Sequence, residues 1–262
     1  MKSIYEIPLN SADGSPNHLE QYKGKAALVV NTTVGCGNAN QMEILQWLQE
    51  KYQDQGFEII AIPTNDYCGP GITSGKWADG ITCGVDSKAY GEDVYGTTFK
   101  YSEMVSSFPH KDFYKMYPQV PSQTTGLVQE TKPPHEIYQE ISLQMKALRE
   151  MKDHLKDSDT KGDFLSPWLN MGFYGGSDMG GNFEKYLIDR DGYVMKHFEN
   201  TVLNYDVEKT LKRSLIEQGK SPSVRDDRSM EMFIEEYAFV CHEIEAAIAG
   251  EKSALNPVMA KV

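Results

Sequence analysis

The sequence predicts an α/β protein in which a strand, a helix and a second strand are followed, much later in the chain, by a β-hairpin. Two apolar runs carry this prediction. Ala26–Asn31 is uncharged and rich in valine, as a buried strand is, and Phe57–Pro63 is a second run of the same kind. This order predicts a parallel pair of strands joined by a right-handed crossover.

The segment between the two strands, Gln41–Gln55, predicts an amphipathic helix. Its apolar residues recur at spacings of three and four: Met42, Leu45, Leu48 and Tyr52. Asn38 and Asn40 are candidate caps for the start of this helix, and Gly56 is the candidate residue for its end.

Three further elements complete the compact part of the chain. After a loop over Asn65–Val85, the sequence predicts a short helix over Ser87–Tyr95. Phe183–Phe198 predicts a β-hairpin that turns at Asp191-Gly192, and Asp206–Gln218 predicts another helix.

Two segments lie outside this pattern. An insertion at about residues 108–181 contains a charged helix from about His135 to Lys156, and an insertion of this length usually covers a site or builds an interface. We therefore expect one domain over residues 1–220 and a C-terminal helical extension over 221–262. An apolar stripe within residues 229–250 either packs on the protein's own core or pairs subunits, and from it we expect a homo-oligomer. The stripe comprises Met230, Phe233, Tyr237, Val240, Ile244 and Ile248.

Composition excludes some classes of function. The net charge is −12 and no basic cluster is present, so a nucleic-acid partner is not expected. The absence of a long apolar stretch predicts neither a signal peptide nor a membrane span. Four cysteines are too few and too scattered for a disulfide scaffold, and no Cys/His cluster has the spacing of a zinc site, so we expect no metal or cofactor. A reducing, cytoplasmic location fits this cysteine content.

Cys36 is the candidate reactive residue. It lies where the first apolar run has stopped and the helix is about to begin, between two glycines. Free N–H groups and the positive end of the helix dipole favour thiolate over thiol there. The alternative is that Cys36 is a small buried hydrophobic residue, although flanking glycines give access rather than packing.

Taken in order, several motifs resemble the glutathione peroxidase family. The resemblance covers most of residues 4–105 and 182–218 and is strongest in Asn182-Phe-Glu-Lys-Tyr-Leu-Ile-Asp-Arg-Asp-Gly192. The other matching pieces are Ile4-Tyr5, Tyr22–Lys25, Val30-Asn31 leading to Cys36-Gly37, Gln55–Ile59, Pro63 with Asn65, and Tyr95–Phe99. The resemblance implies a thioredoxin-like fold, with a central mixed sheet flanked by helices and the reactive residue before the first helix.

The resemblance also implies the chemistry. A thiolate or selenolate reduces hydrogen peroxide or an organic hydroperoxide, and glutathione or a thioredoxin-like protein restores it. Cys36 falls on the nucleophile position and Asn182 on the family's asparagine. The family's tryptophan is replaced by Gly181, and Pro70 or a neighbour replaces its glutamine. Trp168 and Tyr174, near the glycine-rich run before Asn182, are candidate substitute donors.

Two other cysteines bear on how the catalytic cycle closes. Cys83 follows Cys36 by 47 residues (83 − 36), close to the separation of a resolving cysteine in thioredoxin-using relatives, and Cys68 is the second candidate. Two other functions stay open. In one, the same scaffold and nucleophile, natively cysteine or selenocysteine, serve another thiol or selenol reaction. In the other, the protein is a non-catalytic redox sensor or binding protein.

Overall fold

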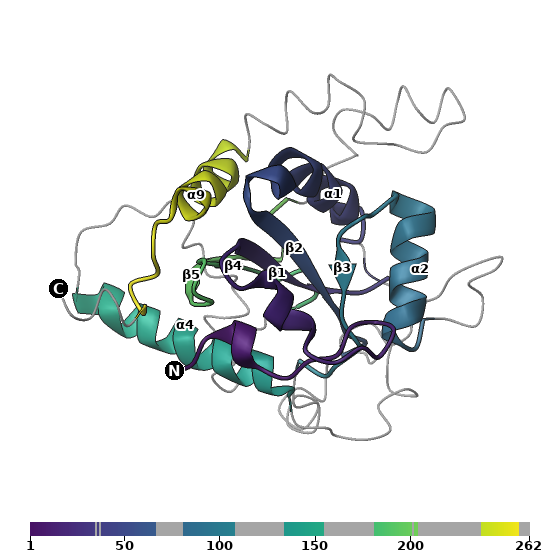
Figure 1. Ribbon diagram of the computed structural model, residues 1–262, viewed down its shortest axis with the longest axis horizontal. Coiled ribbons are helices and arrows are strands. Elements are labelled where there is room, and N and C mark those ends of the chain that lie inside the picture. The colour runs from purple at the N-terminus through teal and green to yellow at the C-terminus, as the bar shows by residue number, and fades with distance from the viewer. Residues whose placement is uncertain are drawn as a thin grey trace, which may run out of the picture.

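A mixed sheet of five strands forms the centre of the molecule (Figure 1). The computed structural model describes residues 1–34, 36, 38–66, 81–107, 134–154, 181–200, 202–203 and 237–256. In sheet order, the strands are β3 (Lys100–Tyr101), β2 (Phe57–Pro63), β1 (Ala26–Thr32), β4 (Lys185–Ile188) and β5 (Val194–Phe198).

The directions of the strands confirm the expected thioredoxin-like arrangement. β1 runs parallel to β2, with Ala26 opposite Phe57, and β2 runs parallel to β3. β4 and β5 are antiparallel to their neighbours, so the second half of the sheet is the predicted hairpin around Asp191-Gly192. Gly192 has φ +91, which favours glycine at this turn.

Helices cover both faces of the sheet (Figure 1). On one face, α1 (Gln41–Tyr52) and α9 (Ala238–Ala249) pack on the alternate residues Leu28 and Val30. On the other face, α4 (Glu136–His154) packs on Ala27 and Val29. Since helices bury both of its surfaces, β1 is buried along its whole length, as its unbroken apolar sequence predicts.

The remaining described elements are short. α2 (Gly84–Tyr95) confirms the short helix predicted over Ser87–Tyr95 and begins three residues earlier than expected. Three 3-10 helices complete the set: Ile4–Glu6, His18–Tyr22 and Gln53–Gln55, the last of which continues the predicted helix beyond α1. Gly56 ends that helical segment with φ +84, as predicted. The predicted helix over Asp206–Gln218 lies outside the described residues.

The described helix of the insertion belongs to the core. Ile137, Tyr138 and Ile141 of α4 are at most 2% exposed and pack in the same cluster as the second face of the sheet. This part of the insertion is therefore a layer of the fold rather than a separate excursion.

The apolar stripe of the C-terminal extension also packs on the protein's own core, as far as it is described. Val240 and Ile244 of α9 are buried at 1% and 0% exposure, in the cluster that holds β1 and α1. Met230 and Phe233 lie outside the described residues. Of the two hypotheses for the stripe, the structure supports packing on the protein's own core. The described residues therefore give no reason to expect a subunit contact.

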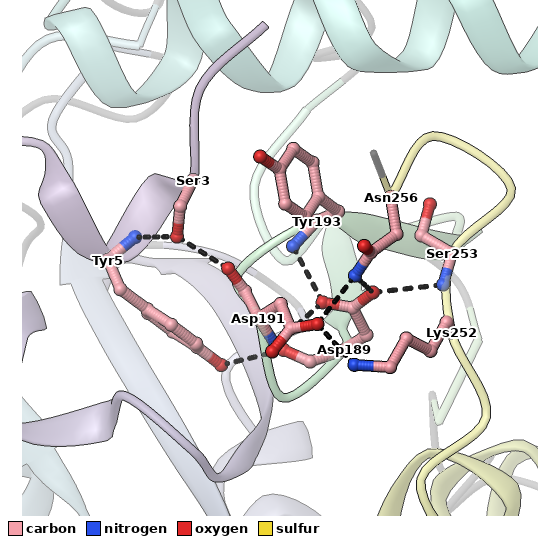
Figure 2. A network of polar contacts seen from close by, with 8 residues as sticks. All are labelled: Ser3, Tyr5, Asp189, Asp191, Tyr193, Lys252, Ser253 and Asn256. Atoms are coloured by element: carbon pink, nitrogen blue, oxygen red, sulfur yellow. Dashed lines mark hydrogen bonds and ion pairs between the residues drawn. The ribbon is translucent and has the colours of Figure 1, made fainter. Parts of the chain in front are cut away.

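A polar network fixes the chain after α9 to the hairpin turn and to the N-terminal segment (Figure 2). The buried carboxylate of Asp189 accepts hydrogen bonds from the backbone of Tyr193 and Ser253, each at 2.9 Å, and from the side chain of Asn256 at 3.1 Å. Lys252 pairs with Asp191 and, together with Asn256, lowers the pKa of that carboxyl group. The C-terminal extension is thereby attached through specific hydrogen bonds as well as through apolar packing.

We predict that Ile244→Ala lowers the free energy of unfolding by about 2–5 kcal/mol, because it opens a cavity beneath α9. Phe239→Ala is the matched control, since Phe239 lies on the same helix but is 44% exposed, and it should cost less. Urea denaturation at several protein concentrations measures both. A midpoint for Ile244→Ala that depends on protein concentration would instead place the stripe at a subunit interface.

Candidate active site at the end of the first strand

Cys36 lies in a series of tight turns between β1 and α1. The backbone N–H of Ala39 donates to the carbonyl of Cys36 at 3.0 Å, and the N–H of Gln41 donates to the carbonyl of Asn38 at 3.0 Å. Each turn leads into the next, and α1 begins at Gln41. The reactive-cysteine hypothesis placed Cys36 just before this helix, and the structure has it there.

The sulfur of Cys36 accepts a backbone hydrogen bond. The donor is the N–H of Asn38, at 3.4 Å from Sγ. The residue is half-buried and packs against the core beside α1. A backbone donor aimed at sulfur stabilises negative charge there, and partial exposure leaves a route for a small reactant.

The predicted capping of α1 is wrong in its chemistry. Asn40 occupies the N-cap position, but its backbone is already helical and its side chain makes no capping hydrogen bond. The backbone carbonyls of Asn38 and Ala39 instead accept hydrogen bonds from the first N–H groups of the helix. Asn38 contributes through its backbone, to the sulfur.

Asn182 lies at the same edge of the sheet as Cys36. β4 runs antiparallel to β1, with Lys185 opposite Val30, so the residues before β4 lie beside the end of β1. The backbone N–H of Phe183 donates to the carbonyl of Asn31 at 2.8 Å. Asn182 is 4% exposed. The topology thus brings together two segments of chain that are far apart in sequence, one leading to Cys36 and one carrying Asn182.

Position 181 lies against the end of the Asn200 side chain, so a larger residue there would require that carboxamide to turn aside. A Cβ atom on Gly181 would lie 2.8 Å from Nδ2 of Asn200. Asn200 is itself held by Gln41, whose Nε2 donates to the Asn200 carbonyl at 2.7 Å. A carboxamide therefore stands beside Gly181, where the resemblance leads one to expect an indole.

Sequence reasoning missed Asn200 and Gln41. The hairpin register could have located Asn200, because Lys185 pairs with Phe198 and two more residues on each strand bring Asn200 opposite Phe183. Nothing in the sequence marks Gln41, which is fully buried on the first turn of α1.

Cys83 is exposed at the N-cap position of α2. Its thiol hydrogen-bonds to Asp86, and this contact is the main reason that the pKa of the Asp86 carboxyl is lowered. The preceding segment is held to the end of β2, since Asn65 donates to the carbonyl of Ile81 at 2.9 Å. Cys83 and Cys36 therefore both lie at the carboxyl edge of the parallel strands.

Lys185 provides a buried amine near this edge. Its Nζ donates to the carbonyls of Phe183 at 2.6 Å and Glu199 at 3.3 Å. Burial lowers the pKa of this amine to about 7, and the neighbouring Glu184 carboxylate acts in the opposite direction. The amine thus joins the segment after Asn182 to the segment before Asn200.

The other predicted site residues, Cys68, Trp168 and Tyr174, lie outside the described residues, as does Pro70. Within the described part of the chain, no group of three or more His, Cys, Asp or Glu side chains could hold a metal ion. No described helix combines the length and the apolar character needed to cross a membrane.

The sheet and the half-buried cysteine before its first helix place this protein among thioredoxin-fold proteins. Comparisons with known proteins show which family it resembles. Residues 4–107 match the family model of glutathione peroxidase. A glutathione peroxidase homolog, BsaA, from Staphylococcus aureus (strain MW2) is 42% identical over 78 residues, which are 30% of this chain and 49% of that protein. The chain thus spans about half the length of the staphylococcal relative it matches.

Two further matches extend over more of the chain at lower sequence identity. A glutathione peroxidase homolog from Neisseria meningitidis serogroup C is 27% identical over 215 residues, covering 81% of this chain and 99% of that protein. The crystal structure of T. cruzi GPX1 is 22% identical, with a TM-score of 0.45, and the match covers 80% of this chain and 94% of that one. The sequence matches confirm the predicted resemblance to the glutathione peroxidase family.

We predict that Cys36 reacts with iodoacetamide faster near neutral pH than Cys83 does, although Cys83 is the more exposed residue. The reason is that Sγ of Cys36 accepts a hydrogen bond, whereas the thiol of Cys83 faces the Asp86 carboxylate. Alkylation rates measured against pH, with peptide mapping of each site, test this. The buried Cys241 serves as the slow reference, and equal rates for Cys36 and Cys241 would contradict the prediction.

Proposed function

We propose that the protein is a thiol peroxidase that reduces hydrogen peroxide or an organic hydroperoxide through Cys36. The observation that carries the proposal is the hydrogen bond from the Asn38 N–H to a half-buried cysteine sulfur at the start of α1. The match of residues 4–107 to glutathione peroxidase supports the same chemistry.

The first step follows from that geometry. The thiolate of Cys36 attacks the terminal oxygen of the hydroperoxide, so that a sulfur–oxygen bond forms as the oxygen–oxygen bond breaks. The sulfur is oxidised to a sulfenic acid, and the leaving alkoxide or hydroxide takes a proton from solvent to become alcohol or water. Asn182 is the candidate donor to the charge that develops on oxygen, because it lies at the same edge of the sheet.

Cys83 is the proposed resolving residue. Its sulfur would attack the oxidised sulfur of Cys36, forming a disulfide and releasing the hydroxyl group as water. Gly84 fixes the start of α2 tightly, since a Cβ atom there would lie 2.4 Å from the carbonyl of Ser102. Any approach to Cys36 that moves the first turn of α2 has to break this contact. Glutathione or a thioredoxin-like protein would then reduce the disulfide.

The replacement of tryptophan by Gly181 favours a second candidate function. With one donor absent from that position, slow oxidation of Cys36 would suit a redox sensor rather than an enzyme. The rate of the first step distinguishes the two functions.

We predict that Cys36 is oxidised by hydrogen peroxide much faster than a free thiol, and that Asn182→Ala slows this step about 10-fold or more, because the developing charge loses a donor. Single-turnover stopped-flow measurements, with sulfenic acid trapping, provide the rates. Cys36→Ser should abolish the signal and Cys241→Ser should leave it unchanged. Oxidation of wild-type Cys36 at the rate of a free thiol would favour the sensor.

One equivalent of peroxide should produce a Cys36–Cys83 disulfide, identified by peptide mapping under non-reducing conditions. Cys83→Ser should accumulate the Cys36 sulfenic acid instead, because its resolving thiol is gone. If the wild-type protein also keeps Cys36 as sulfenic acid with Cys83 free, an external thiol performs the second step.

A further inference from the structure

The segment that carries Asn182 is irregular and strained. Phe183, which follows it directly, is fully buried and has φ +66. This left-handed conformation is unfavourable for a bulky residue by an amount on the order of 1–3 kcal/mol, and persists only where neighbouring groups impose it. Strain of this kind beside a candidate site raises the question of what holds the segment in place.

Asn31, near the end of β1, makes four hydrogen bonds to this segment. Its side-chain Nδ2 donates to the carbonyl of Gly181 at 2.8 Å, and its Oδ1 accepts from the N–H of Glu184 at 2.7 Å. Its backbone carbonyl accepts from the N–H of Phe183 at 2.8 Å, and its own N–H donates to the carbonyl of Glu184 at 3.3 Å. Asn31 is fully buried, so no water substitutes for these contacts.

The four contacts lie on both sides of Asn182. The carboxamide bonds to the residue before it and to the second residue after it, while Lys185 binds the carbonyl of Phe183. The backbone on either side is thereby fixed, and Asn182 lies between. A regular strand ladder could not do this, because Phe183 departs from the extended conformation that a ladder requires.

We propose that Asn31 is a positioning residue that fixes Asn182 relative to Cys36. It belongs to the strand from which the chain continues directly to Cys36, so one residue joins the two halves of the site. Asn31 does not touch the reacting atoms in this account; it acts through Asn182. The proposal rests on the proposed peroxidase function, in which Asn182 stabilises charge during oxidation of Cys36.

Gln49 provides a matched control. It is also a buried carboxamide: its Oε1 accepts from the backbone N–H of Ile59 at 2.8 Å, and its Nε2 donates to the side-chain carboxylate of Glu58 at 2.9 Å. These contacts lie near the start of β2, at the opposite edge of the sheet from Cys36. Removing either carboxamide leaves at least one buried peptide N–H without its partner, that of Glu184 or that of Ile59, so both changes should destabilise the fold.

The test is a double-mutant cycle on the rate of Cys36 oxidation by hydrogen peroxide. We expect Asn31→Ala to slow oxidation about as much as Asn182→Ala, and the double variant to be no slower than either single variant. Gln49→Ala should keep the wild-type rate. A wild-type rate for folded Asn31→Ala, or additive losses in the double variant, would overturn the positioning role. A slow wild-type protein would instead overturn the peroxidase function and this proposal together.

Asn31→Asp keeps the proposal testable if Asn31→Ala does not fold. The introduced carboxyl group has the shape of the carboxamide, and when protonated it can again donate to Gly181 and accept from Glu184. Burial raises the pKa of such a group. We therefore compare the oxidation rates of the variant and the wild type at the same pH, and the ratio of the two should rise as the pH is lowered. A ratio that does not change with pH would count against the role of the donated hydrogen bond.

Discussion

Carboxamide side chains that bind peptide groups of distant segments hold this fold in register where strand and helix hydrogen bonding ends. Asn31 is the central case, since it binds a segment that lies 150 residues further along the chain. Four glutamines make comparable contacts: Gln41 with Asn200, Gln46 with Thr98, Gln49 with Ile59, and Gln144 with Val194 and Lys2. Such groups can donate and accept at once, so each satisfies peptide groups that would otherwise be buried at a cost.

Three of these glutamines lie on α1 and help to determine the position and orientation of this helix on the sheet. Apolar packing alone would leave α1 free to slide or rotate by small amounts, whereas hydrogen bonds at Gln41, Gln46 and Gln49 fix it at three points along its length. The turns that carry Cys36 lead directly into this helix. The direction in which the Asn38 N–H faces the sulfur therefore depends on Gln41, at the start of the helix, whereas Gln49 lies about two turns further along and away from Cys36.

The parts of the fold that depend on local pattern could be predicted from the sequence. The two apolar runs, the helix between them, the Asp191-Gly192 turn and the position of Cys36 all follow from residue spacing and turn chemistry. The polar contacts could not be predicted, because nothing local says which distant backbone group will face Gln41 or Asn31. For the same reason, the stripe on α9 did not reveal whether its partner was the protein's own sheet or another subunit. The site as described lacks Cys68, Trp168 and Tyr174, so the sequence-based hypotheses for those residues remain predictions.

The contacts of Asp189 have a consequence for how the protein is made. Its carboxylate binds the backbone of Ser253 and the side chain of Asn256, while α9 covers the apolar face of β1. During synthesis, the ribosome releases these residues long after the strands they cover. A nascent chain therefore exposes the part of that face that α9 covers until translation has passed Asn256, although all five strands have already been made. Over that interval, the unfinished protein is a natural client for chaperones that shield apolar surface.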